Sequence, residues 1–167
     1  QYAAVTDIDQ NIGRVLDHLE ASGQMENTVI IYTSDHGLSL GQHGFWGKGN
    51  GTRPVNMYDV SIRVPLIVYG DGISGDVSSE RCVDHFDTFQ VICELGGVRL
   101  DFNVRYPGQS YLSLAQGQDD EEWDDTRFGE YGDTRIIRTP HYKLVKRYGH
   151  KADELYDLEN DPGEMDN

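Results

Sequence analysis

The chain has few cysteines, few basic residues and no long apolar run. Its two cysteines, Cys82 and Cys93, lie eleven positions apart and form neither a C-x-x-C pair nor a zinc-ligand spacing. No segment approaches the roughly 18 consecutive apolar residues that a transmembrane helix needs. We therefore expect two buried thiols, no structural zinc site and no membrane partner.

Basic residues are outnumbered two to one by acidic ones. The chain holds 14 Lys and Arg residues against 29 Asp and Glu residues, and its net charge is −15. A polyanion repels the phosphates of nucleic acids, and no basic stripe along the chain offsets that repulsion. The charge balance excludes nucleic acid as a partner, whereas an anionic small substrate would need a local cation to receive it.

The apolar content is high enough for a folded core. Hydrophobic residues make up 37% of the chain, which excludes wholesale disorder. Apolar residues spaced by three and four predict a helix over 3–21, and a second helix is expected over 84–95. Two short apolar runs, at 28–33 and 65–69, lack alternation and predict strands covered on both faces, as in a parallel sheet. The succession of helix, turn and buried strand indicates an α/β fold.

The C-terminal part of the chain has a different pattern. Its segments 133–139, 142–147 and 154–158 are short and polar-alternating, which predicts a small antiparallel sheet. We therefore divide the chain into the end of an α/β domain, residues 1–118, and a small C-terminal subdomain, residues 119–167. Residues 34–63 are glycine-rich and irregular, a length of loop that is uncommon in a compact domain unless it carries function.

The residues with chemical potential lie inside that irregular segment. Asp35 offers a carboxylate and His36 an imidazole, both of which bind metals, and Gly37 allows a tight turn around them. They follow the first buried strand, and ligand sites in open α/β sheets gather at the carboxyl ends of strands. Lys48 lies between two glycines, where its ammonium can approach a bound anion. Taken alone, Asp-His-Gly is a weak signal that fits the start of a polar loop with a capping Asp better than a ligand site.

Several stretches of the chain, in order, resemble the sulfatase family of the alkaline-phosphatase-like superfamily. In the first domain these are 33–37 (TSDHG), 40–48 (LGQHGFWGK) and 58–67 (YDVSIRVPLI). Near the end, 137–144 (IRTPHYKL) and 154–164 (ELYDLENDPGE) resemble the C-terminal subdomain of that family. The resemblance implies part of an alkaline-phosphatase-like sandwich with a central, largely parallel sheet, followed by the small antiparallel subdomain.

The resemblance also implies roles for four residues. Asp35 and His36 would ligate a divalent cation, most often calcium in the family. Because imidazole is a softer ligand than calcium prefers, manganese and magnesium stay open. Lys48 would contact the sulfate group. His43 would assist the leaving group or line the substrate pocket, and a structural role for it in the loop is equally open.

The nucleophile of the family is absent from this chain. Sulfatases form formylglycine from the Cys or Ser of a C/S-x-P-x-R motif, and no cysteine or serine here begins that motif. The acidic metal ligands that precede it in the family are missing as well. We therefore expect a fragment of a longer sulfatase, inactive by itself, with formylglycine upstream. We further expect Arg63 to pair with Asp59 and hold the loop, and His85 and His141 to do no chemistry.

The predicted function is that of a sulfuric ester hydrolase which uses a divalent metal and acts on a sulfated small molecule or a sulfated glycan. Two alternatives stay open: a phosphodiesterase or phosphonate monoester hydrolase of the same superfamily, and a non-catalytic anion-binding relative. A homo-oligomer is compatible with the sequence. The resemblance favours a periplasmic or secreted location, although cytoplasmic members of the family also exist.

Overall fold

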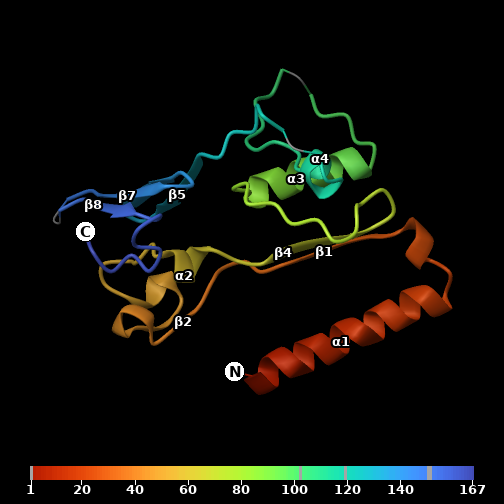
Figure 1. Ribbon diagram of the computed structural model, residues 1–167, viewed down its shortest axis with the longest axis horizontal. Helices are drawn as coiled ribbons and strands as arrows, with labels where there is room; N and C mark the ends of the chain where they lie inside the picture. The colour runs from red at the N-terminus through yellow and green to blue at the C-terminus, as the bar shows by residue number, and fades with distance from the viewer. Residues whose placement is uncertain (1, 102, 119, 150–151) are drawn as a thin grey trace.

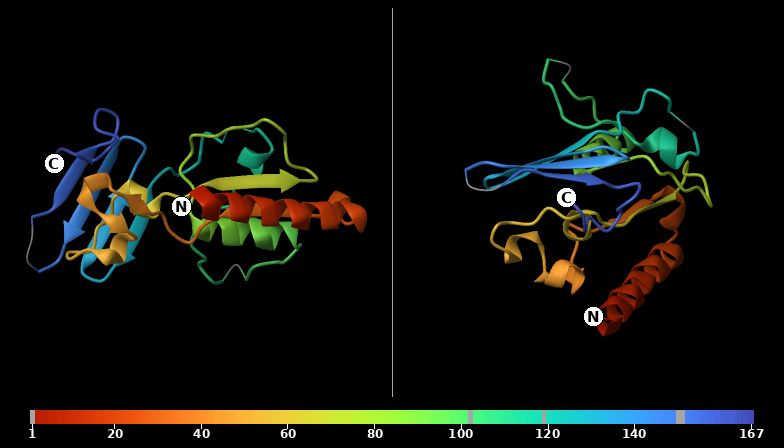
Figure 2. Two further views of the ribbon diagram at one scale, coloured as in Figure 1. Left: turned by 90° about the horizontal axis from the view of Figure 1, so that it is seen from below. Right: turned by 60° about the vertical axis from the view of Figure 1, so that its left-hand side comes forward.

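The computed structural model describes residues 2–101, 103–118, 120–149 and 152–167. A pair of strands forms the centre of the first part, and a second, four-stranded sheet lies beyond one end of that pair (Figure 1, Figure 2). The elements, in chain order, are α1 (Tyr2–Ala21), η1 (Met25–Asn27), β1 (Val29–Thr33), β2 (Ser39–Leu40), η2 (Gln42–Gly44), β3 (Trp46–Gly47), η3 (Gly49–Gly51), α2 (Asp59–Ile62), β4 (Leu66–Gly70), α3 (His85–Leu95), α4 (Leu112–Ala115), β5 (Arg127–Tyr131), β6 (Thr134–Arg138), β7 (Tyr142–Arg147) and β8 (Glu154–Asp157).

Helix α1 forms where the three-and-four spacing predicts it. Gly23 ends it in the left-handed conformation, with φ of +69°, and its N–H donates to the carbonyl of Glu20. No residue of α1 is buried, and Val5, Ile8 and Val15 of its apolar stripe are exposed. No helix in the described part of the chain has the length and apolar character to cross a membrane.

Strands β1 and β4 form the central pair, and here one expectation is wrong. The two strands pair antiparallel, with Ile31 opposite Val68, whereas their apolar runs had suggested a parallel sheet. An unbroken apolar run indicates that both faces of a strand are buried, but it does not indicate whether the neighbouring strand runs parallel or antiparallel. The second face is uncovered in this chain, because Ile67 and Tyr69 are more than half exposed.

Helices α3 and α4 cover the other face of the β1–β4 pair, opposite α1 (Figure 1). Their side chains Val91 and Leu114 pack with Trp123 against Ile31 and Val68. Helix α3 begins at a capping box, in which the Asp84 carboxylate accepts from the backbone of the first turn and the Asp87 carboxylate accepts from the Asp84 N–H. This local signal explains why the predicted helix over 84–95 is confirmed to within one residue.

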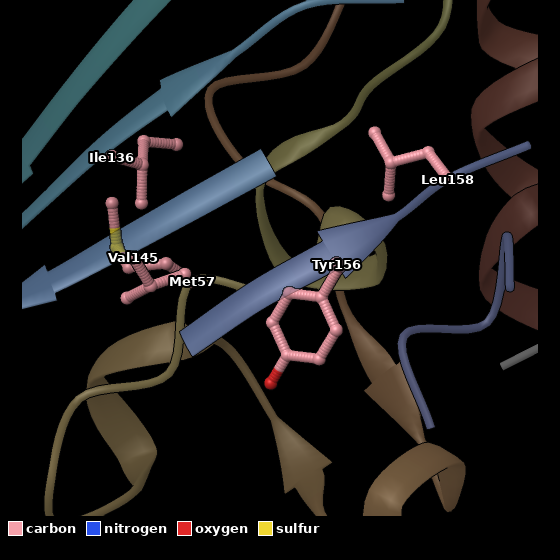
Figure 3. Close-up of a cluster of buried hydrophobic side chains, with 5 residues drawn as sticks. All are labelled: Met57, Ile136, Val145, Tyr156 and Leu158. Carbon is pink, nitrogen blue, oxygen red and sulfur yellow. The ribbon is translucent and has the colours of Figure 1, made fainter. Parts of the chain in front are cut away.

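The C-terminal sheet has four antiparallel strands in the order β5-β6-β7-β8. The three predicted segments are confirmed as β6, β7 and β8, but β5 was missed. Figure 3 shows the core beneath the sheet, where Ile136, Val145, Tyr156 and Leu158 meet Met57 from the loop before α2. The site-bearing segment between β1 and β4 is therefore held against the C-terminal sheet, and the proposed division after residue 118 stays a prediction.

The two cysteines are both free, in agreement with the expectation of unpaired thiols. Cys93 is buried in α3, as expected, whereas Cys82 is only half-buried. The Cys82 sulfur accepts a hydrogen bond from Nη1 of Arg138 at 3.1 Å. Cys82 thus helps to join the loop before α3 to the C-terminal sheet.

Candidate active site

Asp35 and His36 lie directly after β1, at its carboxyl end, as the sequence predicts. Nε2 of His36 is 3.6 Å from Oδ2 of Asp35. The Asp35 side chain is 84% exposed and that of His36 is 39% exposed. Ser34 steadies the turn, because its hydroxyl donates to the His36 carbonyl at 3.1 Å. The two side chains therefore offer oxygen and nitrogen donors to the same open space.

The other nitrogen of the His36 ring fixes its protonation pattern. Nδ1 lies 2.8 Å from the carbonyl oxygen of Gly37. A carbonyl can only accept, so Nδ1 carries the proton in this contact and Nε2 keeps its lone pair in the neutral ring. Histidines that bind metals usually donate their second N–H to a carbonyl or carboxylate in this way. His36 and Asp35 thus fit a divalent cation as a two-donor part of its ligand set.

Gly37 is required for a reason other than the tight turn inferred from the sequence. A Cβ at this position would collide with the carbonyl oxygen of Val60 in α2. The Gly37 N–H also donates to the carbonyl of Ser61 at 3.0 Å. Close approach to α2 is what demands glycine here.

Lys48 follows a hairpin of two short strands, β2 and β3, that returns the chain to the Asp35–His36 segment. Strands β2 and β3 pair Ser39 with Gly47, so Lys48 begins next to the residues that follow Gly37. The Lys48 side chain is exposed. In the part of the chain that the structure describes, it makes no hydrogen bond or ion pair that would occupy its ammonium group. Lys48 is therefore available to an anion.

Asn56, which the sequence did not single out, holds the turn after Lys48. Its backbone N–H donates to the Gly49 carbonyl at 3.1 Å, and its side-chain amide donates to the Thr52 hydroxyl at 3.1 Å. A Cβ on Gly49 would lie 2.7 Å from the Asn56 carbonyl oxygen and 3.6 Å from Cβ of Ser61. The segment that follows Asp35 and His36 and the segment that follows Lys48 consequently both lie close to Ser61 of α2.

His43 occupies the tip of the hairpin and stacks on Tyr58. The two ring centroids are 3.7 Å apart and the rings are inclined by only 3°. His43 adopts the left-handed conformation, with φ of +54°. The structure thus gives His43 a packing role in the loop, while the catalytic role that the sequence suggested stays a prediction.

The expected pair of Arg63 and Asp59 is wrong. Asp59 instead binds Arg138 at 3.1 Å and Lys143 at 2.9 Å, both from the C-terminal sheet. Arg63 contacts Asp59 only through its backbone N–H. Two cations from distant strands occupy the Asp59 carboxylate instead.

His85, to which we assigned no chemistry, touches the metal-ligand loop. Its Nε2 lies 2.9 Å from the carbonyl oxygen of Ser34. The capping box places this residue at the start of α3, and no local pattern signals the contact, which spans 51 residues. His85 supports the backbone that carries Asp35. His141, by contrast, only faces Glu159 at 3.6 Å on the surface.

A cleft of about 1050 Å³ opens between the β1–β4 pair and the C-terminal sheet. It is lined by residues such as Thr33, Leu66, His85, Arg127 and Arg138. None of the four predicted site residues is among those that line it. The cleft therefore adjoins the strand end that carries Asp35 without containing the predicted chemistry.

We predict weak metal binding by the isolated chain. Among the described residues, no three His, Cys, Asp or Glu side chains come together as a metal cluster. Calcium takes six to eight oxygen ligands and magnesium about six, so the pair Asp35 and His36 supplies too few. Titration calorimetry with calcium and with manganese should show binding no tighter than micromolar. Sub-micromolar binding by this chain would contradict the view that the ligand set is incomplete.

Solved structures share the fold of the chain. One was determined in complex with its substrate, D-glucosamine-2-N,6-O-disulfate; it superimposes with a TM-score of 0.81 at 28% identity over 98% of this chain and 34% of that one. The phosphonate monoester hydrolase of Agrobacterium radiobacter gives a TM-score of 0.82 at 27% identity, over 98% of this chain and 35% of the hydrolase. These likenesses confirm the expected class, an α/β chain of the alkaline-phosphatase-like fold.

The sequence comparisons define the family. Residues 1–98 match the family model described as Sulfatase. The chain is 30% identical to an N-acetylglucosamine-6-O-sulfatase of Bacteroides thetaiotaomicron, over 99% of its own length and 30% of that protein. It is 34% identical to an uncharacterized sulfatase of Escherichia coli K12, over 99% of its length and 33% of that protein. The chain belongs to the sulfatase family and spans about a third of the length of these relatives.

Proposed function

We propose that the complete protein is a divalent-metal-dependent sulfuric ester hydrolase to which this chain contributes Asp35, His36 and Lys48. The observation that carries the proposal is the Asp35–His36 pair itself. An exposed carboxylate lies 3.6 Å from an imidazole nitrogen that is free to act as a ligand. Membership of the sulfatase family supports the reaction type.

Each residue has a definite task in this proposal. A bound divalent cation would supply Lewis-acid stabilisation of the sulfate oxygens. Asp35 and His36 hold it, and the hydrogen bond from His36 to the Gly37 carbonyl keeps the ring oriented. Lys48 supplies a fixed positive charge to the sulfate group where negative charge develops. The nucleophile, formylglycine in this family, has no counterpart among the 167 residues.

For the substrate we propose a sulfated small molecule or a sulfated glycan. The relatives include an N-acetylglucosamine-6-O-sulfatase and a choline-sulfatase of Rhizobium meliloti, and one solved neighbour carries a sulfated glucosamine as its substrate. We keep calcium as the first choice of metal, with manganese and magnesium as the alternatives. A periplasmic or secreted location is likewise proposed.

A specific observation favours a second candidate, a phosphonate monoester hydrolase. The Agrobacterium hydrolase superimposes as well as the substrate-bound neighbour does. The test is to purify the complete protein and compare kcat/KM for 4-nitrophenyl sulfate with that for a 4-nitrophenyl phosphonate monoester, before and after removal of metal by a chelator. We expect the sulfate ester to be preferred and the activity to disappear with the metal. Preference for the phosphonate would support the second candidate, and activity on neither ester would support a non-catalytic relative.

A further inference from the structure

A cluster of four charges, two buried and two partly buried, joins the C-terminal turn to the segment that carries the site. The Lys143 side chain is fully buried and that of Glu164 is 2% exposed. The Lys143 ammonium binds both the Glu164 carboxylate and Oδ1 of Asp59, the latter at 2.9 Å. Arg138 binds the other oxygen of Asp59 at 3.1 Å. Two cations and two anions thus balance within one desolvated site, where an unpaired charge would be costly.

Glu164 makes a second contact that reaches the backbone of α2. Its Oε2 accepts a hydrogen bond of 2.6 Å from the N–H of Asp59, the first residue of that helix. The preceding residue, Tyr58, provides no side-chain cap. The first turn of a helix leaves its N–H groups without partners inside the helix. Glu164 therefore caps α2 from a position 105 residues away in the sequence.

The backbone of Glu164 is held in an unfavourable conformation. Its φ is +56°, in the left-handed region that residues with a Cβ rarely adopt. Its N–H closes the turn by donating to the Asp161 carbonyl at 3.0 Å. A conformation of this kind persists only where the surrounding contacts fix it. Here those contacts are the ones to Lys143 and Asp59.

Helix α2 is the common support of the site loops. Gly37, after the metal-ligand pair, donates to the Ser61 carbonyl, and Gly49, after Lys48, lies so close to α2 that an added Cβ would touch the Ser61 side chain. At the start of the helix, Tyr58 stacks on His43 and meets Tyr156 of the C-terminal sheet edge-on. A shift of α2 would therefore move all three segments together.

We propose that the C-terminal turn 161–164 positions the active site through α2, with Glu164 as the positioning residue. The inference rests on the proposed sulfatase function and names no contact between Glu164 and substrate. It predicts that loss of the Glu164 side chain, and with it of the oxygen that caps α2, displaces the loops of His43 and Lys48 while the chain remains folded.

The test compares two variants in the complete protein. Glu164→Gly removes both contacts and accepts the left-handed backbone without strain, which limits the loss of stability. Glu164→Gln keeps an oxygen that can accept from the Asp59 N–H. Because small misplacements of catalytic groups reduce turnover steeply, we expect Glu164→Gly to lower kcat on the order of tenfold with KM nearly unchanged. Glu164→Gln should restore most of that loss.

A measurement that does not depend on activity is the NMR signal of the His43 ring protons. In protein labelled with ¹³C-histidine, the His43 ring protons should be shifted by the ring current of Tyr58 and identified by their loss in His43→Gln. Glu164→Gly should move this signal toward that of an unstacked histidine. If the wild type hydrolyses no sulfate ester, the proposed function fails, but the histidine signal still tests the inference.

The matched control is Glu159→Gln, because Glu159 is in the same C-terminal segment with a side chain that is 70% exposed. All variants are compared well below their own melting temperatures. Wild-type kcat and an unmoved His43 signal in Glu164→Gly would overturn the proposal. The proposal would also be overturned if kcat fell by the same factor in Glu159→Gln as in Glu164→Gly. It would be overturned too if kcat fell in Glu164→Gly while the His43 signal stayed where it is in the wild type.

Discussion

Replacing Lys48 by alanine in the complete enzyme should lower kcat/KM for a sulfate ester on the order of 10²-fold or more, the scale found when one group that stabilises developing charge is removed. Lys48 is exposed, and no ion pair in the described part of the chain depends on it. Its loss should therefore cost little stability. The flanking Gly47 and Gly49 carry no side chains that could replace its charge. Steady-state assays with an aryl sulfate, and circular dichroism to confirm folding, provide the measurement.

Two further variants refine the same prediction. Lys48→Arg should recover only part of the activity, since a planar guanidinium does not reproduce a compact point charge beside glycines. Asp35→Ala should be more damaging than Lys48→Ala because it also loosens the cation. Lys146→Ala, which removes an exposed lysine from β7, is the control and should leave the kinetics unchanged. Turnover close to that of the wild type in Lys48→Ala would show that Lys48 does not contribute to catalysis.

The elements that were predicted correctly have local causes. Helix α1 follows from the spacing of its apolar residues, and α3 from its capping box and the glycines after Leu95. The pair Asp35 and His36 was located because it directly follows a recognisable strand. Such signals are complete within about ten residues of chain, so no tertiary information is needed to read them.

The features that were missed or wrong depend on distant partners. Strand β5 (Arg127–Tyr131) contains Gly129 and lacks the alternation that marks a strand, and it is fixed by pairing with β6 and by the close packing of Gly129 on Ile136. Asp59 was assigned to Arg63, four residues away, but binds cations 79 and 84 residues away. A sequence argument pairs a charged residue with the opposite charge that is nearest along the chain. In the folded protein a charge removed from water binds the opposite charge that is nearest in space.

The Lys143 ammonium should prove to be the most stabilising charge in the C-terminal part. Lys143→Met retains the length and apolar stem of the side chain but removes the cation that binds the buried Glu164 carboxylate and leaves Asp59 paired with Arg138 alone. Breaking a buried ion pair by removing one partner typically costs about 3–5 kcal/mol. We expect a loss of that size in the free energy of unfolding, measured by urea titration at pH 7. The control is Lys146→Met, whose ion pair with Asp153 is solvent-exposed and which should shift the midpoint little.

The pH dependence of stability distinguishes loss of charge pairing from loss of packing in Lys143→Met. Burial tends to raise the pKa of Asp59, but the neighbouring Lys143 and Arg138 outweigh burial and hold it below the ordinary value of 3.8. A carboxyl with a lowered pKa stabilises the fold above its unfolded pKa, and this contribution is lost as the pH falls through the folded value. Without Lys143 the pKa of Asp59 should rise, so less stability remains to be lost in acid. The difference in unfolding free energy between wild type and Lys143→Met should therefore shrink from pH 7 to pH 3. A difference that stays constant over this range would contradict a stabilising role for the charge pairing of Lys143 with Asp59.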